Sequence, residues 1–344
     1  MSKLELKKGE KAEERLRSYF LNLGYFVVRS VNASFQGFEV TDVDLFLYSR
    51  TSPISRERTN VDVKMKQRPQ ALERIFWTKG LQDVLGLEKC IVATTDKRSH
   101  VGDFGAKNSV LVLDGNFMQK LDSAERFSTN RLDEEEFTSL LANATLGELG
   151  CDWKKEFEKV KANLITKLDF EGLNELLNRI KYFMNECCSG NGSEACYRAL
   201  YSSISYFLIT LDYSLKDVSY KEHRERVLII SDGIRFGEKG KIKSEEIVAM
   251  SSALMASFMN RDDYDVNAIK NEVYAQFMAI PADDLAEYLG STKIMQRLLP
   301  MAIEFEGLAY NREFCSPIYA STEIQSIIGL LCDFNSLDRK QILI

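Results

Sequence analysis

The sequence predicts an α+β fold, with a mixed α/β region at the front of the chain and an all-helical region behind it. Strand-like runs of branched and aromatic residues occur only before about residue 126, and amphipathic segments of helical length follow one another after it. The chain has 344 residues, which exceeds the usual size of a single domain. We therefore expect two domains, covering residues 1–125 and 126–344.

The front region is expected to begin with a helix over residues 9–23. Its apolar positions include Leu16 and Phe20, which are four residues apart and so share one face. The same stripe extended backwards reaches Glu13, so that an acid is placed on the inward face of the helix. Glu14 is expected to point toward solvent. A buried carboxylate is costly unless something balances it, so the position of Glu13 needs a functional or structural reason.

Strands and two more helices follow this first helix. We expect strands at residues 25–29, 40–48, 60–66, 89–95 and 109–113, and helices at residues 70–85 and 101–107. Residues 49–58 are polar and contain three arginines, which predicts a loop. Helices between the last three strands favour right-handed crossovers and parallel pairing at the far side of a mixed sheet. The expected order is α-β-β-β-α-β-α-β.

The rear region contains only helical patterns and no repeat of fixed period. Its predicted helices are residues 133–144, 153–164, 172–187, 194–211, 221–230, 245–259, 266–278, 283–289, 293–310 and 322–331. We expect this all-α domain to mediate self-association or to bind a protein partner.

Charge divides unevenly along the chain, although the net value is −6. Residues 1–120 carry 20 Lys and Arg against 15 Asp and Glu, a balance of +5, whereas the remainder carries 25 against 36, a balance of −11. A basic front region attached to an acidic rear region is typical of a protein whose front half faces a polyanion.

The composition also indicates the compartment. No apolar run reaches the roughly 18 residues of a membrane span, and the chain starts with charged residues where a secretory signal would be apolar. The seven cysteines are an odd number without a C-x-x-C pair, which is typical of reduced thiols. We expect a cytoplasmic protein without a membrane segment.

Two acidic strands carry the chemistry that the sequence predicts. Residues two apart in a strand share a face, so Asp62 and Lys64 project together. Asp44 lies on the preceding strand, and Asp42 on the same strand face is an alternative to it. A carboxylate pair beside an ammonium is typical of a site that hydrolyses phosphodiesters with a divalent metal ion.

Magnesium is the expected cofactor, with manganese as a substitute, because a hard cation prefers a few carboxylates together with water and phosphate oxygens. The predicted ligands are the side chains of Glu13, Asp44 and Asp62 and the backbone carbonyl of Val63. Lys64 is expected to position the attacking water through its charge, ahead of any role as a base.

Contacts to nucleic acid are expected from basic side chains that meet phosphates. Lys66 is the best of these because it shares the strand face of Asp62 and Lys64. The other candidates are Arg68, Lys79, Arg50, Arg56 and Arg58.

The order of these acids resembles that of the PD-(D/E)XK nuclease superfamily, whose members have a restriction-endonuclease-like fold. The pattern is a helix acid, then a strand aspartate, then D-x-K, met by Glu13, Asp44 and Asp62-Val63-Lys64. The opening Lys8-Gly9-Glu10-Lys11-Ala12-Glu13 further resembles the Holliday-junction resolvase and Mrr-type branch, and the resemblance covers about residues 7–120. No proline precedes Asp44, where the name of the superfamily would place one.

The resemblance implies an αβββαβαβ core and a Mg²⁺-dependent endonuclease that cleaves DNA, with restriction, phage defence or recombination as its context. Cleavage of two strands by one site per chain favours a homodimer. The alternative is a module on a nuclease-like scaffold that binds DNA without cutting it, or one that serves protein interaction. The sequence leaves open the choices between DNA and RNA and between endonuclease and exonuclease action.

Overall fold

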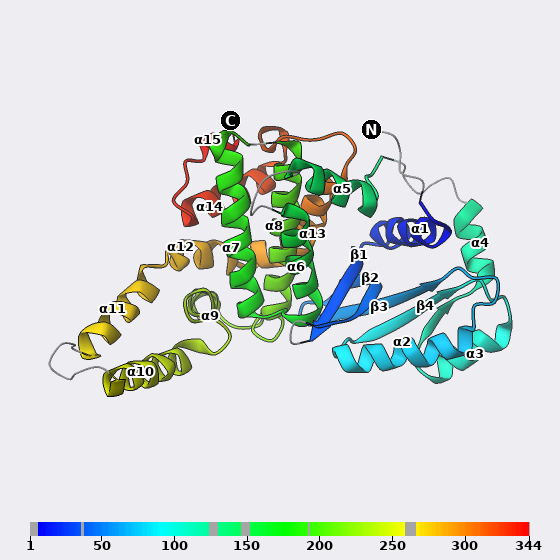
Figure 1. Cartoon of the computed structure of the whole chain (residues 1–344), viewed down its shortest axis with the longest axis horizontal. Coiled ribbons are helices and arrows are strands. Elements are labelled where there is room, and N and C mark those ends of the chain that lie inside the picture. Colours follow the sequence, from blue (N-terminus) through cyan, green and yellow to red (C-terminus); the bar gives the residue numbers. More distant parts are fainter. Residues whose placement is uncertain are drawn as a thin grey trace.

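The computed structural model describes residues 6–35, 38–123, 130–145, 152–191, 193–258 and 266–343. A mixed five-stranded sheet with flanking helices is followed by a helical bundle, so the predicted α+β class is confirmed (Figure 1). The predicted domain boundary after residue 125 lies outside the described residues and stays a prediction.

The sheet has its strands in sequence order across its width. They are β1 (Phe26–Phe35), β2 (Phe38–Ser52), β3 (Ser55–Lys64), β4 (Lys89–Thr94) and β5 (Leu111–Leu113). Strands β1, β2 and β3 pair antiparallel, whereas β3, β4 and β5 pair parallel. The parallel pairs are joined by α2 (Ala71–Leu85) and α3 (Ser99–Lys107), as crossover connections require.

The predicted loop at residues 49–58 is wrong, because β2 and β3 continue as a hairpin. Arg50 pairs with Arg56 and Ser52 pairs with Ser55, so that only Pro53 and Ile54 form the turn. Polar residues extend these strands because their side chains find partners on the rear helices, which a local pattern does not reveal.

Helices cover both faces of the sheet (Figure 1). On one face, α1 (Lys8–Asn22) and α4 (Gly115–Ser123) bury apolar side chains, with Leu16 of α1 packing in the same cluster as Leu45 of β2 and Val61 of β3. On the other face, Ile75 of α2 packs in a cluster with Val92 of β4. The short helix α4 was not predicted.

The rear region is helical throughout its described part. Its helices are α5 (Glu134–Ala144), α6 (Trp153–Thr166), α7 (Phe170–Glu186), α8 (Glu194–Ser214), α9 (His223–Phe236), α10 (Gly240–Phe258), α11 (Val266–Ala279), α12 (Ala282–Leu289), α13 (Thr292–Tyr310), α14 (Thr322–Phe334) and α15 (Lys340–Leu343). No helix among the described residues combines the length and the apolar character that a bilayer crossing requires.

The rear helices share a hydrophobic core with the sheet. Phe26 of β1 and Phe46 and Tyr48 of β2 belong to the same buried cluster as side chains of α6, α7, α8 and α13. The rings of Phe26 and Tyr206 lie edge to face with centroids 6.3 Å apart. Helices α2 and α3 therefore cover the β3–β5 side of this sheet face, and the rear bundle covers the β1–β2 side (Figure 1).

Candidate active site where strands β2 and β3 diverge

Asp44 and Asp62 come together where the β2–β3 ladder ends. The last pair of the ladder at this end is Leu45 with Val61, and one further step of the same register places Asp44 opposite Asp62. Asp44 Oδ2 instead accepts a hydrogen bond from the Val63 backbone N–H, at 2.6 Å. Asp42, the alternative to Asp44, is exposed and pairs with Asn32 on β1, away from β3.

Lys64 completes this group from the next position on the same face of β3. Its Nζ lies 3.9 Å from Asp62 Oδ1, and its side chain is about one-third exposed. An ammonium at this distance can attract an anion from solvent while it remains associated with the carboxylate.

The electrostatic environment of Asp44 is unusual for a carboxylate. Burial raises the pKa of Asp44 to about 7, and the negative charges of Asp62 and Glu13 act in the same direction. The Val63 N–H and Lys64 lower the pKa of Asp44, but they do not cancel the increase. A cation bound next to Asp44 would favour the ionised form of this carboxyl group.

Arg74 of α2 binds Asp62 and was not predicted. Its Nε donates to Asp62 Oδ2 at 2.8 Å, and its Nη2 donates to Oδ1. Such fork-like pairing with both oxygens is the strongest form of this contact. The signal was present in the sequence, because Arg74 lies three residues after Ala71 and four before Thr78, both of which are buried on the inward face of α2.

Glu13 is bound to Arg29, although it lies close enough to Asp44 to raise the pKa of that carboxyl group. Arg29 Nε donates to Glu13 Oε2 at 2.7 Å, and Arg29 stands opposite Leu45, on the sheet face that α1 covers. Burial raises the pKa of Glu13, although Arg29 opposes this effect. Among the described residues, no three His, Cys, Asp or Glu side chains are grouped closely enough to hold a metal ion. The predicted trio is therefore brought together only in its Asp44 and Asp62 members.

A buried ionic network surrounds Arg29 and joins α1 to the rear helices. Arg29 is 1% exposed and donates to Glu14 at 3.0 Å and to both oxygens of Glu135 at 2.7 Å. The expectation that Glu14 faces solvent is wrong, because the rear helices cover that side of α1. Glu134, beside Glu135 on α5, accepts from Lys161 at 2.6 Å and is also paired with Arg17 at 3.4 Å.

Protein-family models, curated proteins and solved structures give no match to this chain. Its chemistry must therefore be inferred from the side chains themselves. Two carboxylates on neighbouring strands beside an ammonium, one of them with a raised pKa, can bind a cation and hold an anionic substrate beside it.

The structure divides the predicted contacts to nucleic acid into two groups. Lys66 and Arg68 follow β3 directly and are exposed near Asp62 and Lys64, where a polyanion could reach them. Lys79 lies on α2, with its Nζ 2.9 Å from Gln82 Oε1 and 3.2 Å from Asp83 Oδ1. Its charge is therefore largely used within the helix.

The three hairpin arginines, which were predicted to contact nucleic acid, bind the protein itself. Arg56 is buried and pairs with both oxygens of Asp212 on α8. Arg58 pairs with Glu88 at 2.9 Å and lies over the Tyr213 ring. Arg50 donates to the Met295 carbonyl at 2.8 Å. These contacts hold the hairpin against the rest of the protein. The three side chains therefore do not form a DNA-binding surface beside Asp44 and Asp62.

Proposed function

We propose that the chain is a Mg²⁺-dependent endonuclease that hydrolyses DNA phosphodiester bonds at Asp44, Asp62 and Lys64. The single observation that carries this proposal is the placement of two carboxylates across diverging strands, with an ammonium on the same face and with the pKa of Asp44 raised to about 7. A leading helix, three antiparallel strands and two parallel strands with a helix before each support a restriction-endonuclease-like core.

Asp44, Asp62 and the Val63 carbonyl would hold the ion, because these oxygen ligands lie together at this end of the β2–β3 ladder. When bound, Mg²⁺ or Mn²⁺ would neutralise phosphate charge and make a water molecule more acidic. Lys64 would hold the attacking water beside Asp62, and Lys66 and Arg68 would bind flanking phosphates. Arg74 would have to release Asp62, and Glu13 would have to leave Arg29 to join the ligands.

We further infer a homodimer that acts in the cytoplasm, since one site per chain must cut twice to break a duplex. Exposed apolar side chains on α2, including Phe76 and Val84, offer one surface for self-association. The rear helices would serve a protein partner through α10, where Ile242, Met250 and Leu254 are exposed.

The test is cleavage of supercoiled plasmid DNA with Mg²⁺ or Mn²⁺. Asp62→Asn and Lys64→Ala are each expected to reduce the rate by about 100-fold or more, because each removes charge that acts on the reacting phosphate. Asp42→Asn is the matched control for Asp62→Asn, since it removes an equal charge at an exposed position on the neighbouring strand β2. Undiminished cleavage by both Asp62→Asn and Lys64→Ala would refute the site.

A second function is favoured by the arginine pairs. Because Arg74 occupies both oxygens of Asp62 and Arg29 occupies Glu13, the same scaffold would suit a module that binds DNA without cutting it. Arg74→Ala distinguishes the two functions. It should retain or increase metal-dependent cleavage in a nuclease, whereas a binding module would show no cleavage before or after the change.

A further inference from the structure

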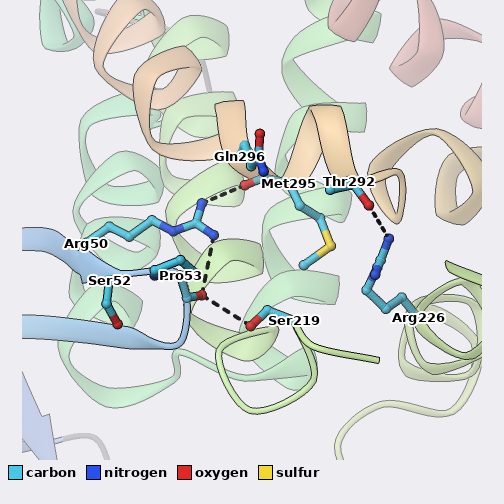
Figure 2. A pocket seen from close by; sticks show the side chains of 8 residues that line it. All are labelled: Arg50, Ser52, Pro53, Ser219, Arg226, Thr292, Met295 and Gln296. Atoms are coloured by element: carbon cyan, nitrogen blue, oxygen red, sulfur yellow. Dashed lines mark hydrogen bonds between the residues drawn. The ribbon is translucent and has the colours of Figure 1, made fainter. Parts of the chain in front are cut away.

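A second charged site lies at the other end of the β2–β3 hairpin, at its contact with the rear helices. A cavity of about 430 Å³ opens there between the hairpin turn, the segment after α8, and the start of α13. Its lining is Arg50, Ser52, Pro53, Ser219, Arg226, Thr292, Met295 and Gln296 (Figure 2). A volume of this size falls within the range of pockets that take small molecules.

Arg226 brings a buried charge to this cavity without an acidic partner. It is 5% exposed, and its Nε donates to the Gly290 carbonyl at 2.9 Å while its Nη2 donates to Thr292 Oγ1 at 2.8 Å. Its Nη1 donates to the Lys221 carbonyl, and in the part of the chain that the structure describes no carboxylate forms an ion pair with Arg226. Carbonyl and hydroxyl dipoles supply only partial charges, so a full positive charge is left uncompensated.

Arg50 adds a second cation from the opposite wall. Its nearest carboxylate, Asp212, lies 3.5 Å away and already binds Arg56 and the Tyr48 hydroxyl. Burial lowers the pKa of Arg50. The charge of Arg56 lowers this pKa further, whereas that of Asp212 raises it. One carboxylate thus serves two guanidinium groups, and the region has a surplus of positive charge.

The start of α13 also makes the cavity more favourable for an anion. Thr292 is its first residue, and Thr292, Met295 and Gln296 face the cavity from its first turn (Figure 2). Ser291 caps the Ile294 N–H, and the other N–H groups of this first turn favour anions. Two arginines and a helix start therefore border one cavity, while Pro53 and Met295 provide apolar surface. The Ser219 hydroxyl donates to the Pro53 carbonyl at 3.1 Å.

We propose that this cavity binds the phosphate group of a small solute, either inorganic phosphate or a phosphate monoester up to the size of a nucleotide. Along β3, Lys64 is nine residue steps from Ser55 at the turn, which at about 3.3 Å per step is roughly 30 Å. The site is accordingly separate from the candidate active site, and its occupancy does not depend on the proposed nuclease function.

Calorimetric titration of the full chain tests this proposal, with inorganic phosphate, adenosine monophosphate and adenosine as three separate probes. Adenosine monophosphate is expected to bind in the micromolar range, with uncharged adenosine bound about tenfold more weakly or worse. Phosphate that binds as tightly as the monoester would identify the free ion as the ligand. Tighter binding of the monoester would show that the apolar wall contributes.

Gln296→Glu provides the specificity test without removing any structural contact of the two arginines. The new carboxylate should weaken binding of the phosphate probe by about tenfold or more through repulsion. Lys293→Gln on the same helix turn is the matched control, because it changes the net charge equally but does not line the cavity. Unchanged melting temperatures without ligand verify that both variants fold. Equal effects of the two variants, or no binding of either phosphate probe at millimolar concentration, would overturn the proposal.

Discussion

Two regions of this protein bury carboxylates, and their environments shift the pKa of the carboxyl group in opposite directions. Burial alone would raise the pKa of Glu134, but Lys161 and Arg17 lower it below its ordinary value. For Asp44, Lys64 and the Val63 N–H do not offset burial, which raises the pKa of Asp44 to about 7. The junction around Glu134 thus behaves as a set of structural ion pairs, whereas Asp44 keeps a carboxyl group whose ionisation a bound cation would favour.

Among the variants that test this contrast, Glu134→Gln should have the largest effect on the free energy of unfolding. It leaves Lys161 without its closest carboxylate, at 2.6 Å, and removes one of the carboxylates that pair with Arg17, which costs about 3–5 kcal/mol of unfolding free energy. Because the pKa of Glu134 is lowered, its stabilisation is present above the unfolded value of about 4.3 and is lost as the pH falls. Urea denaturation at pH 8 and pH 4 measures this effect. The surface change Glu323→Gln is the control, and equal losses in the two variants would show that the junction is not special.

Asp44→Asn should instead increase the stability of the protein at high pH. A raised pKa means that the folded protein keeps a proton that the unfolded chain has released, so stability falls as the pH rises from about 4 to about 7. At about 1.4 kcal/mol per pKa unit, the neutral amide should gain up to ~4 kcal/mol at pH 8 and little at pH 4. Its Oδ1 can still accept from the Val63 N–H.

Thermal unfolding of wild type and Asp44→Asn across this pH range provides the measurement. Mg²⁺ should raise the melting temperature of the wild type and leave that of Asp44→Asn unchanged. A destabilised Asp44→Asn variant at pH 8 would mean that the carboxylate is needed for structure, and the contrast with Glu134 would then fail.

Glu135→Gln should have the smallest effect of the three. Arg29 would lose a two-fold contact but would keep Glu13 and Glu14, and Glu135 is 31% exposed. A loss of about 1–2 kcal/mol in urea denaturation is expected. A loss as large as that of Glu134→Gln would place Arg29, and not Lys161 and Arg17, at the centre of the junction.

The sequence predicted those features of the fold and candidate site that depend on local periodicity. Strand alternation placed Asp62 and Lys64 on one face, and helical spacing located the rear helices with boundaries close to those observed. Helix α4 was missed although its signal is local, since the Asp114 side chain accepts from the backbone N–H groups of Asn116 and Phe117 at its start.

Features that depend on distant residues were not predicted. The length of the β2–β3 hairpin rests on Arg56 meeting Asp212, which is 156 residues away in sequence. The burial of Arg17 rests on Glu306, 289 residues away. From the local pattern, such arginines are predicted to be surface charges. Only in the folded chain do distant carboxylates pair with them and so allow their burial.

The shared core of the sheet and the rear bundle also constrains how the chain is made. Phe46 and Tyr48 are synthesised early, but the α8 side chains that cover them leave the ribosome more than a hundred residues later. Until then, β1 and β2 present an apolar surface that invites misassembly. Separate production of the front half should consequently yield aggregated material, and chaperone protection during translation should matter most between the emergence of β2 and that of α8.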